Sequence, residues 1–165
     1  MIASGLSNMP GTFRDWQEAF GVIKQAGITL RAYTPSAVAA DYEAVCELKT
    51  PIDVRLLILE MAHATAGLCG SPYPDENMKY AMPNKLFEYI AAGIPVICLG
   101  KQHYMAEFIS DHGIGITVDE AREIPIAYQE IQKGNYRKQV LKVREKFVME
   151  KEAERVRVIY EGLIA

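Results

Sequence analysis

Long apolar runs are missing from this sequence. None of its hydrophobic stretches approaches the roughly 18 residues that a transmembrane helix needs. The first residues, MIASGLSNMPG, contain no basic side chain, whereas a secretory signal begins with a positively charged region. We therefore expect neither a transmembrane anchor nor a secretory signal, and we predict a cytoplasmic location, which includes the inner face of the membrane.

Metal-binding and disulfide patterns are missing too. The three cysteines lie far apart in apolar segments, no C-x2-C pair occurs, and the three histidines have no ligand spacing with one another or with cysteine. These residues are Cys46, Cys69, Cys98, His63, His103 and His112. We predict buried, reduced thiols, no metal site, and a structural role for His63.

An excess of one charge sign is also absent. The 18 basic and 21 acidic side chains give a formal net charge of -3, which predicts no general affinity for nucleic acid or an anionic membrane. One basic cluster stands near the C-terminus, KGNYRKQVLKVREK. Because spaced acidic and apolar positions follow it, a solvated helix face is favoured there over a phosphate-binding arm. Walker, G-x-G-x-x-G and G-x-S-x-G motifs do not occur.

What the sequence does contain is a core: half of its 165 residues are hydrophobic, the profile of one folded domain. Segments with the two-residue period of strands alternate with segments of helical period. The expected strands cover residues 1–4, 28–34, 43–49, 64–70, 94–100 and 113–118. The expected helices cover residues 13–27, a short piece within 35–42, 50–64, 83–92, 103–112 and much of the C-terminal third.

Strands that alternate with helices predict an α/β fold: a single Rossmann-like, doubly wound parallel sheet with a helical C-terminal segment. Gly27 and Gly93 are expected to end helices, and Thr50 with Pro51 to begin one. Residues 71–82 show no periodicity, so we predict a loop long enough to have a function. A signalling domain of this class would need a phosphorylatable aspartate at the end of a central strand, and none is convincingly placed.

The stretch PNKLFEY follows this loop and opens the next helix. Ligands of open parallel sheets bind beyond the carboxyl ends of the strands, where such helices begin. Free N–H groups near Pro83 or Asn84, together with Lys85, would suit a phosphate. Glu88, one turn later, can accept hydrogen bonds from two vicinal hydroxyls. The combination describes a nucleotide, although on spacing alone an ordinary surface pair of Lys85 and Glu88 is the commoner explanation.

The segment NKLFEYIAAGIPVI, with SPY ahead of it and FISDHGIGITVDE after it, resembles the donor-binding half of GT-B-type glycosyltransferases of the retaining group 1. The likeness extends to FVMEKEAERVRVIYEGL and covers about residues 64–163, whereas the earlier residues match only in the order of elements. The resemblance implies binding of a nucleotide-sugar as substrate, transfer with retention and without a metal or cofactor, and a place in carbohydrate or cell-envelope glycan biosynthesis.

The resemblance also implies roles for single positions. Glu88 matches the second of the family's paired glutamates, which is associated with the ribose hydroxyls. Lys85 and the amides around Asn84 match the helix start that faces the diphosphate and the sugar. Residues 71–80 would approach the sugar, and residues 28–33 with the loop after them would lie near the base. The predicted ligand-binding residues are Arg14, Tyr80, Asn84, Lys85, Leu86, Glu88 and His103, with Lys85 stabilising the departing diphosphate.

Three of these positions carry open alternatives. Tyr80 stands where the first of the paired glutamates would fall, so that a carboxylate near the sugar would have to come from Asp75 or Glu76. Arg14 is the only basic residue in the loop after the first strand, and it either holds the diphosphate or is a surface arginine. His103 follows a strand end, where a ligand-facing role is one of two interpretations.

Length sets a further limit. GT-B enzymes combine an acceptor-binding and a donor-binding domain, and 165 residues hold only one of them. We predict a donor-binding domain over residues 1–165, with the acceptor-binding domain in cis or on a separate subunit, any membrane association through that missing half, and little turnover alone. The alternative is a non-catalytic, degenerate donor half that docks onto an acceptor subunit through an exposed apolar patch.

Overall fold

The computed structural model describes residues 1–4, 11, 15–34, 42–73, 76–100 and 103–147, and near the C-terminus residues 153–154, 157–159 and 161–162. The short helix expected within 35–42 lies outside these residues except for Tyr42, which is in a turn. None of the described helices is long and apolar enough to cross a lipid bilayer.

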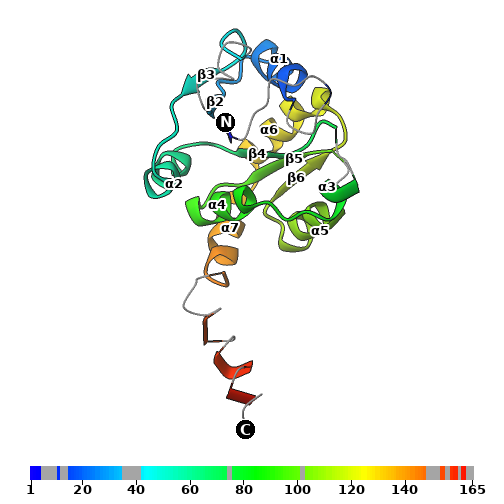
Figure 1. Ribbon diagram of the computed structural model, residues 1–165. Helices are drawn as coiled ribbons and strands as arrows, with labels where there is room; N and C mark the ends of the chain where they lie inside the picture. Colours follow the sequence, from blue (N-terminus) through cyan, green and yellow to red (C-terminus); the bar gives the residue numbers. More distant parts are fainter. Residues whose placement is uncertain are drawn as a thin grey trace.

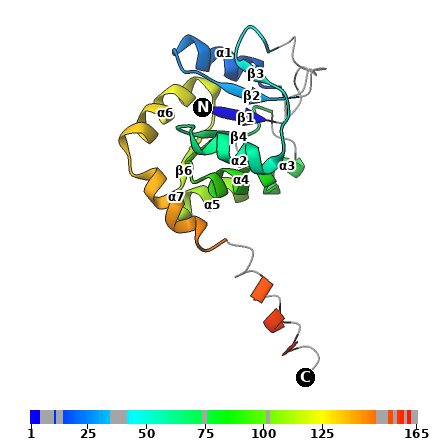
Figure 2. The same ribbon diagram turned by 90° about the vertical axis from the view of Figure 1, so that its left-hand side faces the viewer.

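Six strands form one sheet, and every neighbouring pair in it is parallel. They are β1 (Ile2–Ser4), β2 (Arg31–Tyr33), β3 (Glu47–Lys49), β4 (Gly67–Gly70), β5 (Val96–Leu99) and β6 (Gly115–Val118). Their order across the sheet is β3-β2-β1-β4-β5-β6 (Figures 1 and 2). Each strand lies within its predicted range, and the predicted α/β fold with a parallel, Rossmann-like sheet is confirmed.

Helices cover both faces of this sheet (Figures 1 and 2). On one face, α1 (Gln17–Gln25) and α6 (Ile124–Lys133) bury their apolar side chains in one cluster. The helices that contribute to the cluster on the other face are α2 (Val54–Ala62), α4 (Asn84–Ala92), α5 (His103–His112) and α7 (Tyr136–Arg144). Along β5, Ile97 belongs to the first cluster and Cys98 to the second, as the two-residue period of a strand requires.

The predicted helix stops are confirmed. Gly27 has a φ of 70° and directly follows Ala26, the C-cap residue of α1. Gly93 ends α4 in the left-handed region with a φ of 71°, and the next N–H, that of Ile94, donates to the carbonyl of Tyr89 at 3.1 Å. Such a left-handed residue favours glycine because a Cβ atom is strained there.

Two predicted boundaries are wrong. The helix predicted over residues 50–64 begins only at Val54. The carboxylate of Asp53 accepts the N–H of Arg55 at 2.9 Å and thereby caps α2 in place of Thr50. Residues 71–82 are not wholly a loop, since they contain the short helix α3 (Glu76–Tyr80). A 3-10 helix, η2 (Ala121–Glu123), precedes α6. It starts with a capping box, in which the side chains of Glu120 and Glu123 each accept the backbone N–H of the other residue.

The C-terminal segment is helical, as predicted. The described residues beyond 147 are helical and lie away from the sheet (Figures 1 and 2). Arg157 forms ion pairs there with Glu154 and Glu161, one turn before and after it on the same helix face. Val158 and Ile159 are exposed.

The strand order reverses between β1 and β4, which are joined at a single register position, Ile2 opposite Gly67. Tyr89 of α4 reinforces this junction. Its buried hydroxyl lies 2.9 Å from the carbonyl oxygen of Leu68 and 3.2 Å from that of Ile2, and it donates its proton between them. Its ring covers Gly67, where a Cβ atom would come within 2.5 Å of the ring carbons, so that a side chain at 67 would force the ring to move.

We predict that Tyr89→Phe lowers the free energy of unfolding by about 1–3 kcal/mol, because two buried carbonyl groups lose their shared donor. Urea unfolding followed by circular dichroism measures the change. Tyr104→Phe is the matched control, since it removes a hydroxyl from an exposed ring. Equal stability of the two variants would contradict the role of Tyr89.

Candidate functional site

Helix α4 begins after the carboxyl end of β4, and its N-cap residue, Pro83, makes no side-chain capping hydrogen bond within the described part of the chain. Pro83 precedes the helix in an extended conformation, with φ -71° and ψ 144°. Proline has no side-chain acceptor, so it cannot take the hydrogen bond that serine or aspartate would accept at this position. The start of α4 therefore offers backbone donors and the positive end of a helix dipole at the edge of the sheet where ligands bind.

Lys85 is the second residue of α4 and is partly buried. The hydrogen bond with the Cys98 thiol, together with burial, raises the pKa of the Cys69 thiol well above its ordinary value, and the charge of Lys85 opposes this increase. Lys85 adds a full positive charge where the uncapped helix already favours an anion.

Glu88 lies one turn after Lys85 and is also partly buried. Asn84 is the exposed first residue of the helix. Residues three or four apart share one side of a helix, so α4 brings the amide, the ammonium group and the carboxylate together, as the sequence spacing predicts. The ligand contacts of Asn84, Lys85 and Glu88 stay predictions.

Leu86 is placed differently from its neighbours. Its side chain is fully buried in the core, and its N–H donates to the carbonyl of Pro83 at 3.0 Å. Leu86 thus supports the helix start from the core side. Its predicted binding role stays a prediction.

Tyr80 ends α3 with its ring 59% exposed, and the ring meets that of Tyr104 edge to face, with 5.4 Å between the ring centroids. Glu76, one of the acids that could have supplied a carboxylate near the sugar, is paired with Lys79 at 2.5 Å. The rings of Tyr80 and Tyr104 thus form a contact between α3 and α5.

Arg14 and Asp75 lie outside the described residues, so their predicted roles stay predictions. His103 is the first residue of α5, four positions after Leu99, the last residue of β5. This position agrees with the expected strand end, and the structure does not describe its side chain. The proposed ligand contact of His103 therefore also stays a prediction.

Two buried hydroxyl groups near strand ends were missed. Ser71 follows β4, and its Oγ accepts the N–H of Tyr73 at 3.2 Å. Thr34 follows β2 and is 3% exposed, and its hydroxyl has no hydrogen-bond partner within the part of the chain that the structure describes. Their place directly after a predicted strand was a usable signal, because polar residues at carboxyl ends lie at the ligand-binding edge.

The thiols form no disulfide: all three are free, and two of them are buried. Cys69 and Cys98 lie side by side in the register of β4 and β5. Burial raises the pKa of Cys46, which is only partly buried, to about 11. Among the described residues, no three histidine, cysteine, aspartate or glutamate side chains could together hold a metal ion.

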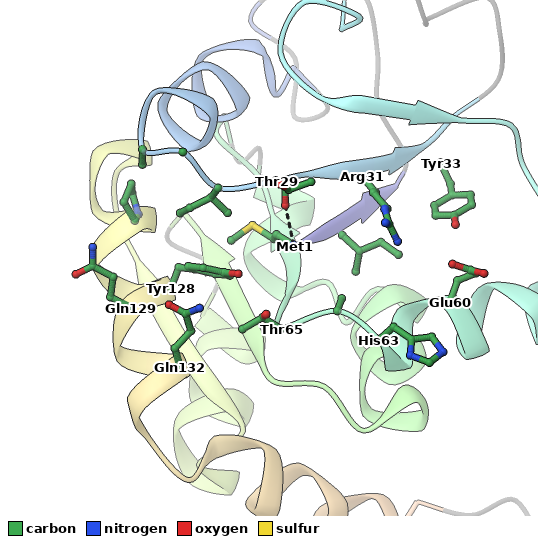
Figure 3. A pocket seen from close by; sticks show the side chains of 16 residues that line it. Met1, Thr29, Arg31, Tyr33, Glu60, His63, Thr65, Tyr128, Gln129 and Gln132 are labelled. Carbon is green, nitrogen blue, oxygen red and sulfur yellow. Dashed lines mark hydrogen bonds between the residues drawn. The ribbon is translucent and has the colours of Figure 1, made fainter.

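A cavity of about 540 Å³ opens at the opposite, amino-terminal edge of the sheet (Figure 3). Arg31 and Tyr33 line it from β2, Glu60 and His63 from the end of α2, and Tyr128 from α6. His63, predicted to be structural, is exposed there. The cavity is distinct from the predicted site, which lies at the carboxyl ends of the strands.

Solved structures with the same fold are glycosyltransferases of the GT-B type. The chain is similar to Os79 from O. sativa, solved in complex with U2F and trichothecene, at 15% identity and a TM-score of 0.60, over 88% of this chain and 36% of that one. It is similar to the glycosyltransferase SnogD from Streptomyces nogalater at 16% identity and a TM-score of 0.60, over 88% and 38%. AviGT4, a glycosyltransferase involved in avilamycin A biosynthesis, matches at 16% identity and a TM-score of 0.55, over 92% and 50%.

The chain belongs to the family described as glucosyltransferase 3-like, C-terminal domain, whose model matches residues 11–149. The predicted resemblance to the C-terminal domain of a GT-B glycosyltransferase is thereby confirmed. The chain spans about a third of the length of Os79 and of SnogD and half of that of AviGT4. No curated protein matches it.

We predict that Tyr80 and Tyr104 stabilise the fold as a pair. Edge-to-face pairs contribute about 0.5–1.5 kcal/mol beyond their burial, so the effects of Tyr80→Ala and Tyr104→Ala on the free energy of unfolding should fall short of additivity by about that amount. Urea unfolding of both single variants and of the double variant measures the coupling.

The matched comparison combines Tyr104→Ala with Tyr128→Ala on the opposite face of the sheet, where the effects should add. Full additivity of the Tyr80 and Tyr104 effects would show that the ring contact contributes nothing to stability.

Proposed function

We propose that this chain is the donor-binding domain of a glycosyltransferase that recognises a nucleotide-diphosphate sugar. The observation that carries the proposal is the uncapped start of α4 with Lys85 beside it, at the carboxyl edge of a doubly wound sheet. Membership of the glucosyltransferase 3-like family supports the same reading. The solved enzymes are about two to three times as long as this chain. The glycosyl transfer carried out by a complete enzyme is therefore proposed for this protein.

The diphosphate would bind at the start of α4. The N–H groups around Asn84 would donate to phosphate oxygens, and the Lys85 ammonium would supply a compensating charge. When the bond from sugar to diphosphate breaks, negative charge grows on the leaving group. Donors already held in place at that position stabilise the transition state more than the ground state, which accelerates transfer.

The nucleoside would extend from α4 across the switch point. Glu88 would accept hydrogen bonds from the two ribose hydroxyls, one turn along the helix from the phosphate. The end of β2 lies two strands from β4, roughly 10 Å away at the usual spacing between strands. That separation suits a base bound near Thr34 while the diphosphate is held at α4.

The rest of the reaction would need the acceptor-binding half, in cis or as a separate subunit. We propose transfer with retention of configuration, without a metal, in carbohydrate or cell-envelope glycan synthesis in the cytoplasm. Any membrane association would come from the acceptor half, and nucleic acid is not a partner. The transferred sugar would approach residues 71–80, where Tyr80 stands in place of a carboxylate.

Calorimetry with UDP-, GDP-, ADP- and TDP-linked sugars tests the proposal, and we expect one class to bind. UDP ligands are the first probe, because Os79 was solved with UDP. Lys85→Ala and Glu88→Ala should each weaken binding by about tenfold or more, since a hydrogen bond to a charged group contributes about 1.5–3 kcal/mol. Lys133→Ala, which removes an exposed lysine at the end of α6, should leave the affinity unchanged.

Two results would contradict the assignment. The first is that none of the four nucleotide classes binds the folded chain. The second is that a nucleotide binds with the same affinity to Lys85→Ala and Glu88→Ala as to the unsubstituted protein.

The alternative is a non-catalytic donor half that serves as an interaction subunit. Tyr80 at the position of the family's first glutamate favours it, because the carboxylate near the sugar is then absent. This alternative expects a stable complex with a separately produced acceptor domain on gel filtration, with no requirement for nucleotide. A complex that forms only with nucleotide present would favour the catalytic reading.

A further inference from the structure

The cavity at the amino-terminal edge of the sheet has a largely polar lining (Figure 3). Its volume of about 540 Å³ lies within the range of sites that hold small molecules. In Figure 3, Tyr128 and Gln132 of α6 stand on one side of it, Tyr33 and Glu60 on the other, and Thr65 between them. Side chains from three elements and a loop thus surround one hollow, which the proposed donor site at the opposite edge does not use.

These side chains suit a ligand that carries hydroxyl groups. A hydroxyl group both donates and accepts hydrogen bonds, and the Thr65 hydroxyl and the Gln132 amide do the same, while the Glu60 carboxylate accepts. Burial, followed by the charge of Glu60, raises the pKa of Tyr33, and the charge of Arg31 opposes the increase. The Tyr33 phenol therefore keeps its proton at neutral pH and can donate it. An apolar ligand would cover these groups without bonding to them, which costs free energy.

The charges at this edge give no preference for an ionic ligand. Arg31 lines the cavity, and its guanidinium is already paired with Glu47 at 3.1 Å. Arg137 donates to two carbonyl groups at the end of α2, less than one turn after Glu60. Two arginines therefore stand against two glutamates. The carboxyl-terminal end of α1, where Gly27 lines the cavity, adds a partial negative charge that disfavours a phosphate.

We propose that this cavity binds a neutral mono- or disaccharide, whose hydroxyl groups bond to Glu60, Thr65 and Gln132. The C–H faces of a sugar ring are apolar, so the partly buried rings of Tyr33 and Tyr128 can pack against them. The cavity lies at the sheet edge opposite the start of α4, so the saccharide held in it is not the sugar of the donor. This second site is non-catalytic, and it does not depend on nucleotide binding.

Saturation-transfer NMR and calorimetry with maltose, cellobiose, lactose and chitobiose, without nucleotide, test the proposal. We expect at least one of these disaccharides to bind. Glu60→Ala should weaken its binding by about tenfold or more and Gln132→Ala by about two- to tenfold, because a hydrogen bond to a charged group contributes more than one to a neutral amide.

Glu107→Ala and Gln17→Ala are the matched controls, since they remove an exposed carboxylate and an exposed amide outside the cavity. Both should leave the affinity for the disaccharide unchanged. All four substituted side chains are exposed, so the circular dichroism spectra should stay native. Lys85→Ala separates the two sites, because a saccharide in the cavity should bind to this variant as tightly as to the unsubstituted chain.

Four results would overturn the proposal. The first two are that none of the disaccharides binds, or that one binds with an affinity that neither Glu60→Ala nor Gln132→Ala weakens. Loss of binding in Lys85→Ala would place the saccharide in the donor site instead. Binding of inorganic phosphate that Gln132→Ala weakens would assign the cavity to an anion. Because no nucleotide is present, failure of the donor-binding proposal would leave these results unaffected.

Discussion

The contact of Tyr89 with Gly67 and with the backbone of two strands is the constraint on which the rest of the site depends. β1 and β4 are three and four residues long and share one register position, so their pairing has little support of its own. The Tyr89 hydroxyl lies between carbonyl groups of both strands, and its ring needs the space above Gly67. The middle of α4 is thereby anchored over the switch point, and its first turn is held at the carboxyl edge.

Much of the fold could be predicted because its determinants are local. The two-residue period marked the strand over residues 28–34, and short apolar segments marked those over residues 64–70 and 94–100. Gly93 stopped α4 through a left-handed conformation that favours glycine. The start of α2 could not be located in the same way. Thr50 and Asp53 are both good capping residues, and only the folded chain shows which carboxyl or hydroxyl group accepts the first free N–H.

The residues of the candidate site also fall into two groups, those with a local sequence signal and those without one. Lys85 and Glu88 were found because residues three apart share one side of a helix. The same periodicity places Leu86 with Tyr89 and Ile90 on the buried side, so its burial was readable from the sequence. The ring pair of Tyr80 with Tyr104 joins segments 24 positions apart, and such a contact has no local signal. Short α3, with five residues, is below the length at which periodicity is visible.

Pro83 has a consequence for any attempt to make this protein more robust. A designer seeking stability would replace it with aspartate or serine, because a capping side chain would stabilise an uncapped helix by about 1 kcal/mol. That side chain would occupy the donors that an incoming anion needs, and aspartate would also repel it. The position is thus one where resistance to heat and readiness for a ligand make opposite demands, and the chain carries the residue that leaves the donors open.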